Sequence, residues 1–62
     1  MEQTLRDRIE SMLKRLEDRC TQLDEYIIQY SNEGNYVNAG INQLKKETFE
    51  FIAKDLRLQL NS

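Results

Sequence analysis

The sequence predicts an all-α protein, an antiparallel two-helix hairpin that we expect to dimerise into a four-helix bundle. Residues 3–31 contain neither Gly nor Pro and repeat apolar residues at helical spacing. A polar stretch at residues 31–36 then supplies Gly34, and a second helical pattern follows it. The chain therefore reads as one domain, with a helix at about 3–31, a turn at about 32–35 and a helix at about 36–59.

The first helix is predicted from an unbroken heptad pattern of apolar residues. Thr4 is suited to cap its N-terminus, with Asp7 three residues later as in a capping box. Further apolar residues at Leu5, Met12 and Ile28 make the apolar surface broader than a two-stranded seam requires, which is typical of a bundle. The seam itself alternates steps of four and three residues and consists of Ile9, Leu13, Leu16, Cys20, Leu23, Ile27 and Tyr30.

The turn is predicted from Gly34 and its asparagine neighbours. Gly34 is suited to the left-handed conformation that ends a helix, and Asn35 to capping the next one. The run from Gly34 to Ala39, Gly-Asn-Tyr-Val-Asn-Ala, resembles the inter-helix turn of tetratricopeptide repeats. That resemblance implies an aromatic Tyr36 packed between two antiparallel helices. Gln43 and Lys46 depart from the repeat's pattern, so the resemblance supplies turn geometry and no family.

The second helix carries two candidate seams, and its last residues admit a second interpretation. Alternation in residues 56–60 is also compatible with a strand, although nothing breaks the helical run before it. Gly40 within the helix reflects either neutral drift or a close approach of the two helices. One seam passes Val37, Ile41, Leu44, Thr48, Phe51, Asp55 and Leu58, and the other passes Asn42, Lys45, Phe49, Ile52, Leu56 and Leu60.

A turn centred near residues 33–34 predicts which layers of the two helices face each other. We expect the large apolar residues of the first seam to lie against the first helix near the turn. The expected layers are Ile27 with Ile41, Leu23 with Leu44, Cys20 with Thr48, Leu16 with Phe51 or Ile52, and Leu13 with Leu56.

Composition argues against enzymatic, metal and membrane functions. The chain has no His and one cysteine, Cys20, so we expect no metal, no cofactor and no internal disulfide. Cys20 is expected to be a buried apolar residue, with an intermolecular disulfide as the alternative. No set of catalytic side chains is recognisable, so we expect no enzyme. No apolar run is long enough to span a membrane and no signal peptide is evident, which favours a cytoplasmic protein.

The favoured function is a small protein-interaction module, an adaptor or regulator that acts as a helical-hairpin homodimer. A chain of 62 residues has a marginal core, and oligomerisation is the stabiliser that its composition leaves. Apolar residues of the second helix exceed what one neighbouring helix covers, so they either build the homodimer core or bind a different protein. The predicted interface residues are Phe49, Phe51, Leu56, Leu58 and Leu60, together with the turn-proximal Tyr26, Tyr30 and Tyr36.

Two alternative functions are suggested by proteins that the chain resembles in size and in helical architecture. In architecture the chain is similar to small plasmid RNA-binding regulators that form antiparallel four-helix bundles. Arg8, Arg15 and Arg19 lie near one face of the first helix, but acidic neighbours and a net charge of −2 argue against nucleic acid. The chain also looks like the helical-hairpin chaperones of type III secretion systems, which have a turn followed by a Tyr, as in Gly34-Asn35-Tyr36. That likeness implies a subunit that shields an apolar helix of a partner.

Overall fold

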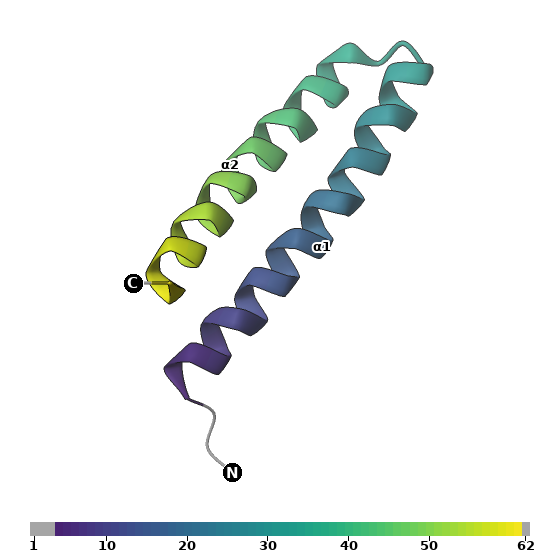
Figure 1. Cartoon of the computed structure of the whole chain (residues 1–62). Helices are drawn as coiled ribbons and strands as arrows, with labels where there is room; N and C mark the ends of the chain where they lie inside the picture. Colours follow the sequence, from purple (N-terminus) through teal and green to yellow (C-terminus); the bar gives the residue numbers. More distant parts are fainter. Residues whose placement is uncertain (1–3, 62) are drawn as a thin grey trace.

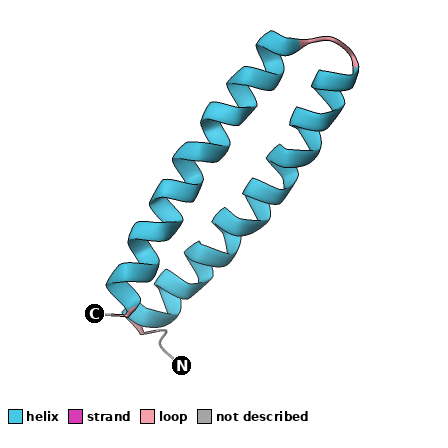
Figure 2. Cartoon of the chain, turned by 45° about the horizontal axis from the view of Figure 1, so that its top comes forward, coloured by secondary structure: helices cyan, strands magenta, loops and turns pink. Residues whose placement is uncertain are grey.

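Two antiparallel helices pack side by side along their length (Figure 1). The computed structural model describes residues 4–61, in which α1 comprises Leu5–Asn32 and α2 comprises Tyr36–Leu60. The predicted all-α hairpin is confirmed, and Figure 2 shows its two helices joined by one short loop. The predicted first residue of the first helix, Gln3, lies outside the described residues. The segment at 56–60 is helical, so the strand interpretation is wrong.

A reciprocal pair of hydrogen bonds fixes the start of α1, as the sequence predicts. The Asp7 backbone N–H donates to the Thr4 hydroxyl over 3.1 Å, and the Thr4 backbone N–H donates to the Asp7 carboxylate over 3.4 Å. This capping box satisfies backbone donors that have no partner within the helix.

The turn is a Schellman motif that passes directly into the next helix. Gly34 has φ +76°, the left-handed conformation that glycine adopts without a side-chain penalty. The Asn35 N–H donates to the Tyr30 carbonyl over 2.8 Å, and the Gly34 N–H donates to the Ser31 carbonyl over 3.1 Å. Asn35 also caps α2, because its side chain accepts from the Asn38 N–H over 3.3 Å. Asn35 therefore both closes α1 and starts α2.

The predicted seam of α1 is the face that packs against α2. Leu13 and Leu23 are buried, with 7% and 1% of their surface exposed. The remaining members are all half-buried: Ile9, Leu16, Cys20, Ile27 and Tyr30. The heptad prediction for the first helix is therefore confirmed.

The face of α2 that packs against α1 differs from the prediction. The predicted layers put Ile41, Leu44 and Phe51 toward α1, yet these side chains are 46–75% exposed, and Ile52, the alternative to Phe51, is 40% exposed. Thr48, paired with Cys20 in the predicted layers, is exposed as well. The buried and half-buried residues form another heptad series: Ala39, Asn42, Lys46, Phe49, Ala53, Leu56 and Leu60.

Large residues of α1 and small residues of α2 explain this rotation. Contacts such as the Cys20 thiol with the Lys46 carbonyl, 3.9 Å apart, set the register between the helices. In that register Leu13 lies level with Ala53, and Ile27 lies level with Ala39. An alanine opposite a large aliphatic residue lets two helix backbones approach without a void. Size complementarity thus outweighs the larger apolar area that the opposite face of α2 offers.

Gly40 makes no close approach to α1. It is exposed, and a Cβ atom built on it meets nothing within 4 Å. Of the two interpretations left open for this glycine, a close approach of α1 and α2 is therefore not seen in the hairpin.

Candidate interaction surface

A continuous apolar series lies on the side of α2 that faces away from α1. We call this series the outer seam. Its members are Val37, Ile41, Leu44, Thr48, Phe51, Asp55 and Leu58, at the alternating steps of four and three that define a heptad seam. The seam extends from residue 37 to residue 58, and these 22 residues of α2 span about 33 Å. All seven side chains are exposed, so α2 carries one heptad seam toward α1 and a second one outward.

The outer seam contains the two most exposed large apolar side chains of α2. Val37 and Phe51 are each 75% exposed, and Leu44 is 65% exposed. A shallow depression of about 330 Å³ with almost entirely apolar walls lies beside them. Its lining residues are Ile41, Leu44, Lys45, Thr48 and Phe49. A depression of this size along a heptad seam is suited to receive an apolar side chain from a facing helix.

The structure divides the predicted interface residues of α2 between two surfaces. Phe51 and Leu58 are exposed on the outer seam. Phe49, Leu56 and Leu60 are half-buried in the contact with α1. The predicted layers placed Ile41 and Leu44 in the hairpin contact, and Val37 was not among the predicted interface residues, so these three are additional residues of the outward surface. The alanines at 39 and 53, two heptads apart, are the sequence signal that identifies the inner face.

The three tyrosines near the turn have different environments. Tyr30 is half-buried in the α1 seam. Tyr26 is 38% exposed, and its hydroxyl accepts a hydrogen bond from the Gln22 amide over 3.2 Å. Tyr36 is 73% exposed at the start of α2, so the packing between helices that the repeat-like turn implies is absent in this hairpin.

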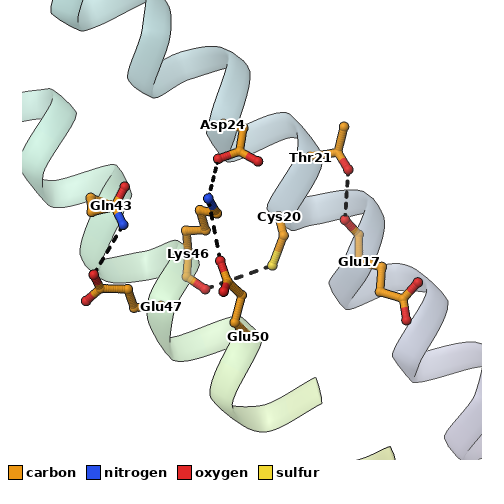
Figure 3. Close-up of polar contacts among 8 residues, drawn as sticks. All are labelled: Glu17, Cys20, Thr21, Asp24, Gln43, Lys46, Glu47 and Glu50. Carbon is orange, nitrogen blue, oxygen red and sulfur yellow. Dashed lines mark hydrogen bonds and ion pairs between the residues drawn. The ribbon is translucent and has the colours of Figure 1, made fainter. Parts of the chain in front are cut away.

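Ion pairs join α1 to α2, and Figure 3 shows the one that Lys46 forms with Asp24. The Lys46 ammonium lies 2.5 Å from the Asp24 carboxylate and 3.6 Å from the Glu50 carboxylate. The hydrogen bond to Asp24 raises the pKa of Lys46 above its ordinary value. Toward the termini, Arg57 of α2 pairs with Glu17 of α1. Lys46 thus covers the inner face with its aliphatic stem while its charge reaches the edge.

Cys20 stands beside this ion-pair group. Burial raises the pKa of the Cys20 thiol, and the Glu50 carboxylate adds to the effect. The thiol therefore stays protonated at neutral pH, the less reactive state. Cys20 also borders an open groove of about 540 Å³, whose other walls include Glu17, Lys54 and Arg57. Cys20 was expected to be a buried apolar residue, and it is half-buried at this edge of the contact between the helices.

Other kinds of site find little support in residues 4–61. No group of three or more potential metal ligands comes together in this part of the chain. Neither described helix is long and apolar enough to cross a lipid bilayer. Arg15 and Arg19 are exposed on α1, but Asp18 and Glu25 line the same shallow surface. Comparison of the chain with protein-family models, curated proteins and solved structures found no match.

Proposed function

We propose that this chain is a non-enzymatic protein-interaction module whose binding surface is the outer seam of α2. The observation that carries the proposal is the outward position of Val37, Ile41, Leu44, Phe51 and Leu58 on one face of one helix. Contiguous apolar surface of this kind marks interaction sites in proteins. Many proteins bind a partner by packing such a helix face, with apolar residues at helical spacing, against an apolar groove.

The energetics of the hairpin support a partner on this face. Among the described residues, four apolar side chains are buried, and two of them are alanines. Covering the exposed part of each large outer-seam residue is favourable by roughly 1 kcal/mol. A helical partner along the seam therefore adds burial of large apolar side chains that the hairpin by itself leaves exposed. The homodimer and four-helix bundle expected from the sequence are one form of this proposal.

A stabilising subunit for another protein is the second candidate function. The length of the outer seam favours it, because one apolar helix of a partner fits along its full extent. In that case the hairpin shields the partner's helix as a one-to-one heterodimer. An adaptor or regulator and a stabilising subunit share the same surface, and they differ in the stoichiometry of the complex.

Affinity capture with matched variants tests the proposal. The bait is the whole chain, compared with Phe51→Asp on the outer seam and with Ser11→Asp on the exposed surface of α1. We expect partners that wild type and Ser11→Asp retain, and that Phe51→Asp loses while keeping its helical circular dichroism spectrum. Partners retained equally by Phe51→Asp, or nucleic acid retained only at low salt, would contradict the proposal.

A further inference from the structure

The charges that flank the outer seam complement one another in only one arrangement of two α2 helices. On one flank lie Glu47 and Lys54, and on the other lies Lys45. The seam itself contains one charge, Asp55. All four side chains are exposed, and in residues 4–61 the ion pairs of the hairpin involve none of them. The Glu47 carboxylate accepts a hydrogen bond from the Gln43 amide of its own helix over 3.2 Å, and all four charges remain exposed to a molecule that lies along the seam.

We propose that the outer seam binds the outer seam of a second copy of this chain, with the two α2 helices antiparallel. This inference rests on the proposed function and names the partner of the same surface. The two-fold axis passes near residues 49–50. About this axis the core layers are Ile41 with Leu58, Leu44 with Asp55, and Thr48 with Phe51, each formed twice.

In this register opposite charges meet on one flank, and Lys45 on the other flank approaches the acidic residue of the facing seam. Glu47 of each copy lies beside Lys54 of the other, because flanking positions of the same kind face each other in an antiparallel pair. Lys45 of each copy lies level with Asp55 of the other. Asp55 thus gains a cation where it would otherwise stand against Leu44. Electrostatic complementarity of this kind selects register and orientation more than it adds affinity.

Neighbouring registers and the parallel arrangement bring like charges together. Sliding one antiparallel helix by a heptad toward the turn places Glu47 against Glu47 and Lys45 against Lys45 of the second copy. Parallel helices in register place the two Asp55 carboxylates in the same core layer. Like charges at such positions are unfavourable. The same residues therefore favour one arrangement and disfavour its nearest competitors.

Charge reversal tests the pairing without altering the apolar seam. Glu47→Lys and Lys54→Glu each convert two attractive contacts per dimer into repulsive ones, and we expect about tenfold weaker dimerisation. The double variant exchanges the two charges and should dimerise as wild type does. A mixture of the two single variants should form a heterodimer more tightly than either variant dimerises alone. Sedimentation velocity over a range of concentrations measures the dimerisation of wild type, of the three variants and of the mixture.

Matched controls and salt sharpen the result. Glu25→Lys and Lys14→Glu make the same charge changes on the exposed surface of α1 and should leave dimerisation unchanged. The differences between single variants and wild type should shrink in 1 M salt, where charges on the surface are screened. Failure of the double variant or of the mixture to recover dimerisation would overturn the antiparallel pairing.

Failure of this pairing and failure of the proposed function give different results. A chain that stays monomeric at high concentration, yet loses a captured partner on Phe51→Asp, overturns self-pairing and leaves the outer seam as a binding surface. A monomeric chain whose captured partners are indifferent to Phe51→Asp overturns both. A dimer that persists in Phe51→Asp overturns self-pairing, because Phe51 lies in the central layers.

Discussion

Substitutions of Leu23 and Phe51 distinguish the surface that holds the hairpin together from the surface that we propose binds a partner. Leu23 is 1% exposed between the helices, so Leu23→Ala should cost about 2–5 kcal/mol of hairpin stability at any protein concentration. Phe51 is 75% exposed, and Phe51→Ala should change the stability of the isolated hairpin by no more than about 0.5 kcal/mol. The two variants therefore differ in kind as well as in size.

The substitution of Phe51 should lower the free energy of dimerisation, and not the stability of the isolated hairpin. Burying a whole Phe side chain is favourable by about 1.5–3 kcal/mol, and three quarters of this one remain to be covered, so each copy contributes roughly 1–2 kcal/mol. Both copies lose this contribution in the variant dimer, for a total of about 2–4 kcal/mol. Dimerisation should therefore weaken by about 30- to 700-fold.

Urea unfolding followed by circular dichroism at two protein concentrations is the assay. Wild type should unfold at higher urea when it is concentrated, and Phe51→Ala should lose most of that concentration dependence. Leu23→Ala should lower the midpoint at both concentrations. A large loss of stability for Phe51→Ala in dilute solution would refute the outward position of the seam.

Three further predictions concern the turn, the second glycine and the ion pair. Gly34→Ala should destabilise the hairpin by about 1–2 kcal/mol in urea unfolding, because φ is +76° there, and Gly34→Asn should cost less. Gly40→Ala should stabilise the dilute hairpin by about 0.5–1 kcal/mol, because an added Cβ meets nothing within 4 Å; an unchanged or lower midpoint would contradict this. The raised pKa of Lys46 means that its pairing with Asp24 stabilises the fold fully below the unfolded-state pKa, about 10.4, and that this stabilisation is lost as pH rises through the folded-state value. The urea midpoint of unfolding should therefore fall above about pH 10. It should fall less in Lys46→Met, which keeps most of the apolar side chain and removes the charge. An equal fall in the variant would show that Lys46 does not cause the loss of stability at high pH.

The sequence was a good guide wherever local chemistry decides the structure. Thr4 and Asp7 form the capping box because their spacing lets each side chain reach the other's backbone N–H. Gly34 takes the left-handed conformation because it lacks a side chain. The seam of α1 was predictable because its opposite surface is charged, which leaves one apolar face.

The facing of α2 was not predictable from apolar periodicity alone. Its two faces differ by half a turn of the helix, and the outward face carries the larger apolar residues. The inner face is selected by a property of both helices together, the fit of Ala39 and Ala53 against large residues of α1. From the sequence alone Lys46 would be expected on the surface. Its position between the helices depends on the ion pair with Asp24 of α1. The predicted interface residues of α2 lie on both of these faces for the same reason. The hydrophobicity of a residue does not determine which neighbouring helix covers it.

A dilution series of amide NMR spectra tests most directly the central claim that α2 pairs through its outer seam. We predict that signals of residues 37–58 of α2 move with concentration, most strongly at Leu44, Thr48, Phe51 and Asp55 near the centre of the pairing. Signals of the charged outer surface of α1, such as those of Lys14 and Glu25, should stay in place. Spectra that do not change from micromolar to millimolar concentration, or changes confined to α1, would contradict the claim.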